Sequence, residues 1–130
     1  MNRSPHVLLV APTPSVASAF NAGLTDAGLR VTLVTTFKDA RQGLESCPDL
    51  LISEVRLGEY NGLHLALRAQ GHNIPAIVVS ETNQFTRQDA VTVGADYLEE
   101  DCNAERLQSA VRAAGVATPG RFTRRTQPAA

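Results

Sequence analysis

The sequence predicts an α/β fold with a doubly wound, five-stranded parallel sheet and five helices. One observation is a set of short apolar runs that are continuous and largely β-branched, which is typical of strands covered on both faces of a parallel sheet. The runs are Val7–Val10, Val31–Val34, Leu50–Val55, Ala76–Val79 and, with a weaker pattern, Tyr97–Leu98. The other observation is that segments with helical spacing separate these runs, and such alternation indicates a parallel sheet.

The first helix has both of its ends marked in the sequence. Thr13 and Pro14 form an N-cap and N1 pair, and Gly28 follows at the position where a left-handed residue is favoured. Between these ends, apolar residues recur at helical spacing and line one face. They are Val16, Ala19, Phe20, Gly23, Leu24 and Ala27.

Further helices are expected after each of the remaining strands. They span Phe37–Glu45, Gly62–Gln70, about Phe85–Val93 and Ala104–Ala114. Pro48 prevents the first of these from continuing into the third strand. In the second of them, Leu63, Ala66 and Leu67 share one apolar face, and Gly71 ends the helix.

Length and composition limit the classes of function. The chain is expected to form one domain over residues 1–115, followed by a flexible tail or linker over residues 116–130. Its formal net charge is −1, so no overall charge attracts nucleic acid or an anionic membrane. The N-terminal apolar run is too short for a signal peptide or a membrane span. Cys47 and Cys102 stand far apart and are expected to be reduced thiols of a cytoplasmic protein.

Functional residues are expected directly after the strands, because open parallel sheets bind ligands at the carboxyl ends of their strands. These positions hold Ala11 and Pro12 after the first strand, Glu54 and Arg56 at the third, Ser80 at the fourth and Glu100 at the fifth. The most unusual of them is Glu54, a lone carboxylate that ends an apolar strand. No glycine-rich nucleotide-binding motif follows any of the predicted strands.

Four segments of the chain resemble the response-regulator receiver domains of bacterial two-component signalling. They read VLLVAPTPSV, PDLLISEVRLGEYNGLHLAL, IPAIVVSET and GADYLEED. The resemblance covers about residues 6–114, and the second segment carries it most specifically. It implies a flavodoxin-like, receiver-type fold and a role in phosphorelay signal transduction.

The resemblance also implies where receiver chemistry should lie. Receivers hold Mg²⁺ with an acidic pair after the first strand, and here Ala11 and Pro12 occupy those positions. Neither can ligate a cation that needs oxygen ligands, so neither Mg²⁺ nor another cofactor is expected. The family's phosphoacceptor Asp matches Glu54, and the lysine that pairs with the phosphoryl group matches Glu100, which reverses the charge.

Two positions of the family's conformational switch are retained. Ser80 matches the hydroxyl that senses the phosphoryl group, and Tyr97 matches the aromatic residue that follows it. Arg56 is a candidate counter-charge for Glu54. One hypothesis is that Glu54 hydrogen-bonds Ser80 and holds the domain in one state; the alternative is that Glu54 caps the following loop as a relic of a lost site.

The sequence therefore predicts a non-enzymatic, phosphorylation-independent pseudo-receiver that acts by protein–protein contact. The family implies a contact surface made by the fourth helix, fifth strand and fifth helix, which are about Phe85–Val93, Tyr97–Leu98 and Ala104–Ala114. A protein partner or a homodimer is expected there, and neither nucleic acid nor a membrane. Two alternatives stay open: a flavin-, cobalamin- or nucleotide-binding domain on the same scaffold, and a receiver that still accepts phosphate on Glu54.

Overall fold

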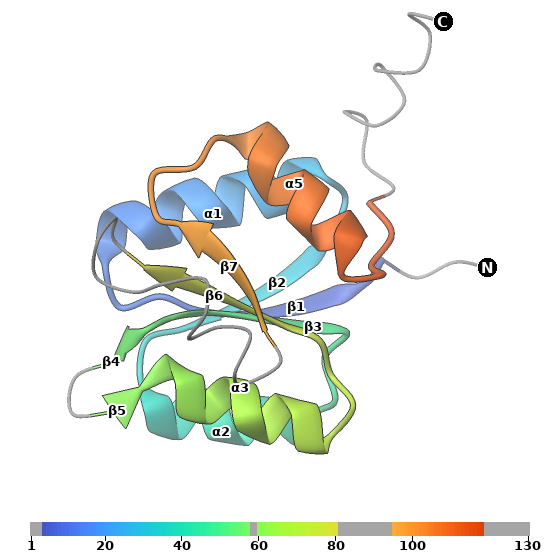
Figure 1. The fold of residues 1–130 in the computed structure, drawn as a ribbon. Helices are drawn as coiled ribbons and strands as arrows, with labels where there is room; N and C mark the ends of the chain where they lie inside the picture. The colour runs from blue at the N-terminus through green and yellow to red at the C-terminus, as the bar shows by residue number, and fades with distance from the viewer. Residues whose placement is uncertain (1–3, 58–59, 81–94, 119–130) are drawn as a thin grey trace, which may run out of the picture.

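Five parallel strands form the central sheet (Figure 1). The computed structural model describes residues 4–57, 60–80 and 95–118, and the fold is given for these ranges. The strands are β1 (His6–Val10), β2 (Arg30–Val34), β3 (Leu50–Glu54), β6 (Ala76–Ser80) and β7 (Asp96–Glu99). They lie in the order β2-β1-β3-β6-β7 with every neighbouring pair parallel, so the predicted doubly wound sheet is confirmed.

Helices cover both faces of this sheet. They are α1 (Pro14–Asp26), α2 (Phe37–Leu44), α3 (Gly62–Gly71) and α5 (Ala104–Ala113). In Figure 1, α1 and α5 lie on one face of the sheet, and α2 and α3 lie side by side on the other. The helix predicted over residues 85–93 lies outside the described residues.

Both predicted ends of α1 are confirmed. Thr13 is the N-cap residue with an extended backbone, and Pro14 is the first helical residue. At the other end Gly28 has a φ of 87°, in the left-handed region that glycine reaches without strain. Ala19 is the one member of the predicted apolar face that is exposed.

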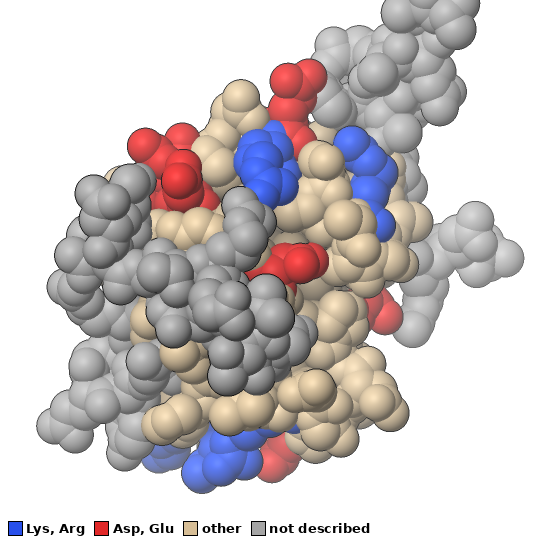
Figure 2. All heavy atoms as spheres, viewed as in Figure 1, with Lys and Arg blue, Asp and Glu red and all other residues tan. Residues whose placement is uncertain are grey.

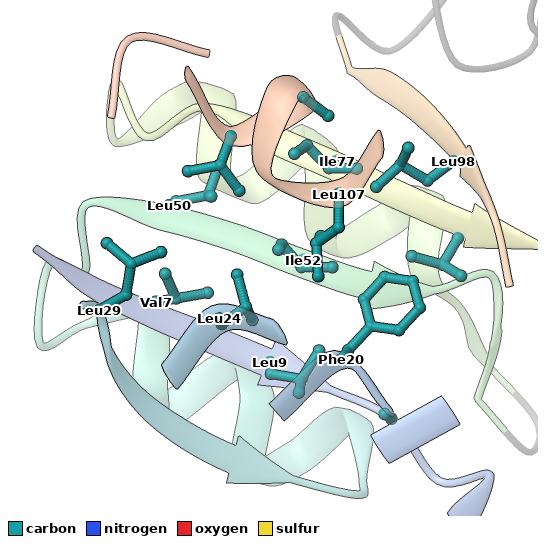
Figure 3. Close-up of a cluster of buried hydrophobic side chains, with 14 of the residues drawn as sticks. Val7, Leu9, Phe20, Leu24, Leu29, Leu50, Ile52, Ile77, Leu98 and Leu107 are labelled. Carbon is teal, nitrogen blue, oxygen red and sulfur yellow. The ribbon is translucent and has the colours of Figure 1, made fainter. Parts of the chain in front are cut away.

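Two apolar layers hold the helices to the sheet. In the first layer, Phe20 and Leu24 of α1 and Leu107 of α5 pack against strand residues that include Ile52 and Leu98 (Figure 3). The second layer lies between the sheet and the other two helices and includes Leu8, Leu44, Leu51 and Leu65. Successive strand residues point to opposite faces, so each central strand contributes to both layers. This double burial is the reason that the central strands are continuous apolar runs.

Two predicted apolar surfaces differ from the structure. Strand β2 was expected to be covered on both faces, but Leu33 is 43% exposed because β2 is an edge strand of the sheet. In α3 the residues that face the sheet are Leu65, Ala66 and Ala69, which leaves Leu67 49% exposed. Of the three residues on the predicted apolar face of α3, Ala66 is buried and Leu63 packs against the second apolar layer, so only Leu67 departs from the prediction.

The described chain stays packed beyond residue 115. Val116 is buried in the first apolar layer, and the Arg112 guanidinium donates to the Thr118 hydroxyl at 3.3 Å. The two cysteines are free, with Cys47 exposed and Cys102 half-buried. Within the described ranges, none of the helices combines the length and apolar character needed to cross a bilayer.

Candidate functional site

The fold brings four of the predicted site positions to one edge of the sheet. Glu54 ends β3, and Ser80 ends the neighbouring strand β6. Ala11 follows β1, which lies on the other side of β3. Just beyond β7, the Glu100 N–H donates to the Ser80 carbonyl at 3.1 Å. The carboxyl edge of the sheet is therefore where the site is assembled, as the sequence predicts.

Within the described part of the chain, the Glu54 carboxylate is held by Thr13. It is 7% exposed, and its two oxygens accept two hydrogen bonds from Thr13. The Thr13 N–H donates to Oε2 at 3.0 Å, and the Thr13 hydroxyl donates to Oε1 at 2.8 Å. Because these bonds are made to an ionised acceptor, they are stronger than neutral hydrogen bonds of the same length.

Thr13 is placed for this role by the start of α1. It is the N-cap residue of the helix, yet its side chain makes no capping bond within that helix. Its hydroxyl turns to Glu54 instead, so the carboxylate lies at the positive end of the α1 dipole. The pair thus ties the end of β3 to the start of α1.

The length of the Glu54 side chain fits this contact. Aspartate is shorter by one methylene, which amounts to about 1.5 Å of reach along the chain. With oxygen–donor distances of 2.8 and 3.0 Å for Glu54, an aspartate in the same backbone position would leave both Thr13 donors beyond hydrogen-bond range. The extra methylene therefore carries the carboxylate from β3 to the loop before α1.

The backbone of Glu54 is fixed as tightly as its side chain. The buried Ser53 hydroxyl donates to the Glu54 carbonyl at 2.8 Å, and the Gly62 N–H donates to the Val55 carbonyl at 2.6 Å. A Cβ at Gly62 would meet the Glu54 carbonyl oxygen and the Ser53 hydroxyl. A short antiparallel pair, β4 (Arg56–Leu57) with β5 (Tyr60–Asn61), leads into this close approach and has no counterpart in the predicted elements.

The other predicted positions lie around this pair. Ser80 is buried, and Tyr97 is half-buried against the second apolar layer. Glu100 is half-buried next to Ser80. The side chain of Arg56 lies outside the described part of the structure. The hydrogen bonds described for the Glu54 carboxylate go to Thr13, and its predicted contact with Ser80 stays a prediction.

The residues at the edge do not fit a Mg²⁺ ion of the kind that receivers hold. Ala11 is 1% exposed, and its methyl group packs in the first apolar layer. Pro12 beside it has no side-chain oxygen, and the Glu54 oxygens already accept from Thr13. Among the described residues, no three His, Cys, Asp or Glu side chains are grouped to bind a metal ion. A hard divalent cation needs several oxygen ligands, and the described residues of this edge do not offer them.

A comparison with protein families decides the family of the chain. The model of the response regulator receiver domain matches residues 7–112. The chain belongs to the response-regulator receiver family. The receiver fold predicted from the resemblance is thus confirmed, and the edge described above is the receiver pocket of this chain.

Known proteins resemble this chain in sequence and in fold. The luminescence regulatory protein LuxO of Vibrio campbellii is 30% identical over 108 residues, which are 79% of this chain and 24% of LuxO. The chain therefore spans about a quarter of the length of this curated relative. A response regulator receiver protein from Burkholderia phymatum has a TM-score of 0.77 at 24% identity, covering 89% of this chain and 99% of its own. A two-component response regulator from Clostridium difficile has a TM-score of 0.76 at 21% identity, over 85% and 95% of the two chains.

One functional residue of this receiver pocket was missed by sequence reasoning. Thr13 was assigned only the N-cap of α1, which it is. Its contact with Glu54 joins residues 41 positions apart, and only the folded sheet brings them together. A usable signal was present, because Thr13 comes directly after the two substituted metal-ligand positions and is therefore close to any carboxylate at the end of β3.

Proposed function

We propose that this receiver is a phosphorylation-independent pseudo-receiver, a cytoplasmic, non-enzymatic module that signals by contact with another protein. The observation that carries the proposal is the Thr13–Glu54 pair. At the position where receivers accept a phosphoryl group, this chain has a longer carboxylate whose two oxygens are already hydrogen-bonded.

The charge balance of the pocket supports the same proposal. Phosphoryl transfer to a carboxylate depends on positioning and on neutralisation of charge by a metal ion and a cation. Ala11 and Pro12 stand where the metal ligands would be, and Glu100 stands where the family has lysine. An incoming phosphoryl group would meet negative charge there and would also have to displace Thr13 from Glu54.

The contact surface that we propose includes β7 and α5, together with the segment 85–93. In its described part, a hollow of about 320 Å³ lies beside β7 and the start of α5, lined by Tyr97, Glu99, Cys102, Asn103 and Arg106. Burial raises the pKa of the Cys102 thiol, so this side chain is a protonated apolar group at neutral pH. A hollow with a tyrosine and an arginine has the composition that protein interfaces favour. A protein partner or a second copy of this chain would occupy it.

The proposal is tested by phosphodonor treatment. The protein is incubated with a small phosphodonor and Mg²⁺, and its intact mass is measured. We expect no gain of mass. A stoichiometric gain of one phosphoryl group that is lost in Glu54→Gln would show a live acceptor and overturn the proposal.

A second measurement tests the output of the pocket. If Glu54 and Thr13 hold the interaction surface in one state, Glu54→Ala should change homodimerisation or the capture of a partner. Analytical ultracentrifugation of parent and variant measures the first, and quantitative pull-down measures the second. If homodimerisation and partner capture are the same in Glu54→Ala and in the parent, Glu54 does not hold the interaction surface in one state and has a structural role only.

A further inference from the structure

Residues of α2 and α3 line a groove. These two helices lie on the face of the sheet opposite α5 (Figure 1). Its volume is about 690 Å³. It is lined by Phe37, Lys38 and Arg41 of α2 and by His64, Leu67 and Arg68 of α3. None of these residues belongs to the receiver pocket or to the contact surface proposed above.

The charged groups that line the groove are all basic. Lys38 and Arg41 lie three positions apart on α2, and His64 and Arg68 lie four positions apart on α3, so each pair faces the groove from one side. The acidic residue of α2, Asp39, is exposed but does not line the groove. Figure 2 shows Lys and Arg side chains, with an acidic side chain beside them, along the lower edge of the molecule, where Figure 1 places these two helices.

The lysine and arginine side chains of the groove are not neutralised by other side chains that the structure describes. Among the residues whose side chains the structure describes, 4–55, 62–80 and 95–118, no hydrogen bond or ion pair engages the side chains of Lys38, Arg41 or Arg68. The formal net charge of the chain is −1, so this basic groove runs against the overall charge. A local concentration of unneutralised charge attracts a ligand of the opposite sign.

The groove also offers apolar surface. Leu67 is 49% exposed and is one of two large apolar side chains exposed among the residues whose burial the structure describes. Phe37 lines the other side and is half-buried. Leu67 is not needed to pack α3 on the sheet, because Leu65, Ala66 and Ala69 already form the buried face of the helix. The groove therefore combines an apolar centre with a basic rim.

We infer that this groove docks a protein segment that carries an apolar side chain flanked by carboxylates. The apolar side chain would contact Leu67 and Phe37, and the carboxylates would pair with Arg41, Arg68 and Lys38. A nucleic acid fits less well, because its affinity comes from many phosphate contacts along a longer basic track. The inference does not depend on the state of Glu54.

The test uses a fluorescein-labelled peptide in which glutamates flank leucine and phenylalanine, titrated with the full chain by fluorescence polarisation. We expect saturable binding that weakens as NaCl is added, because the rim pairs are exposed to solvent. Two matched peptides separate the contribution of charge from that of apolar contact. One has glutamine for each glutamate, and the other has serine for each apolar residue. Both should bind roughly tenfold or more weakly, since each loses one of the two contributions.

Variants of the chain locate the binding. The double variant Arg41→Gln/Arg68→Gln and the single variant Leu67→Ser should each weaken binding of the glutamate peptide by roughly tenfold. The charge control is Arg30→Gln/Arg112→Gln, which removes the same charge from two exposed sites outside the groove and should bind as the parent does. It also removes the bonds of Arg30 to the Ser4 carbonyl and of Arg112 to the Thr118 hydroxyl, so its folding is verified together with that of the groove variants. Glu54→Ala should also bind as the parent does, which separates this test from that of the proposed function.

Several outcomes would overturn the inference. They are the absence of saturable binding up to about 1 mM protein, equal losses in the groove and control double variants, and equal binding of the glutamine peptide. An oligonucleotide that competes as well as the peptide would also overturn it, because the groove would then be a general polyanion site. Circular dichroism of each variant verifies that a loss of binding does not reflect unfolding.

Discussion

At the scale of single residues, the Thr13 hydroxyl makes a contact that can be removed without disturbing the helix it precedes. Thr13→Val keeps the shape of the side chain and removes the donor to Glu54 Oε1. Because the carboxylate is nearly buried, we expect the free energy of unfolding to fall by about 1–3 kcal/mol. Urea denaturation measures this change.

Two variants make the Thr13 result specific. Thr13→Ser keeps the hydroxyl and should lie closer to the parent than Thr13→Val. Thr25→Val removes an exposed hydroxyl, whose bond to Asn21 is 3.4 Å long, and should change the stability by less than about 0.5 kcal/mol. If Thr13→Val costs no more than Thr25→Val, the Thr13–Glu54 bond contributes nothing to stability.

His6 is a second residue whose surroundings make a prediction, here on pH. Burial lowers its pKa below the ordinary value of 6.5, with Arg30 acting in the same direction and Asp49 opposing. The ring also lies 2.7 Å from the Thr32 hydroxyl. The folded state therefore favours the neutral ring, and the unfolded state binds the proton more readily.

The sign of the pH effect follows from this difference. The contribution of His6 to stability is present above pH 6.5 and is lost as the pH falls through 6.5 toward the lower pKa of the folded state. We expect the urea midpoint of the parent to fall over this range and that of His6→Gln to fall less. His72→Gln, at an exposed histidine, should follow the parent. Parallel curves for the parent and His6→Gln would contradict the prediction.

At the scale of elements, α3 offers a matched pair of glycines. Gly62 begins the helix where a Cβ would meet the Glu54 carbonyl oxygen, a backbone atom that cannot turn away. Gly71 ends the same helix with no atom within 4 Å of the Cβ position. We expect Gly62→Ala to lower the free energy of unfolding by about 1–3 kcal/mol. Gly71→Ala should leave it unchanged or raise it by up to about 1 kcal/mol.

Thermal and urea unfolding of the two glycine variants provide the comparison. A loss in Gly62→Ala alone shows that the close approach of α3 to the end of β3 is required. Equal effects of the two substitutions would show instead that helix propensity outweighs the contact.

The elements also show what the sequence could and could not predict about the fold. Continuous apolar runs predicted the strands, because burial on both faces demands them, and capping residues predicted the ends of α1. In α3 the exposure of Leu67 and the full burial of Leu65 could not be predicted, because the two leucines are equally apolar and local spacing cannot decide which of them the sheet covers. The exposure of β2 depends on strand order, which no local pattern contains.

At the scale of the whole molecule, the positions of the site were predictable and its contacts were not. Strand ends of a parallel sheet meet at one edge, so Ala11, Glu54, Ser80 and Glu100 could be grouped from the sequence. The partner of Glu54 could not, because a carboxylate at that edge has several polar neighbours within reach. The choice of Thr13 depends on the side-chain length and on where the start of α1 lies relative to β3.

The last prediction concerns the response of the whole domain to Mg²⁺. A ligand that binds only the folded protein raises the free energy of unfolding. The increase depends on the ratio of the ligand concentration to its dissociation constant. The parent chain, with Ala11 and Pro12 at the metal-ligand positions, should show the same melting temperature in MgCl₂ and in KCl of equal ionic strength. The triple variant Ala11→Asp/Pro12→Asp/Glu54→Asp should be less stable than the parent without Mg²⁺, because it places like charges together at a nearly buried edge.

Added Mg²⁺ should then reverse part of that loss in the triple variant only. At ten times the dissociation constant the gain is about 1.4 kcal/mol, which is large enough to shift a melting curve of a domain this size by several degrees. Differential scanning calorimetry with both salts measures it. If the parent melts at a higher temperature in MgCl₂ than in KCl, the pocket binds the ion through other oxygens and the prediction is wrong. This comparison uses the parent alone, so it does not require the triple variant to fold.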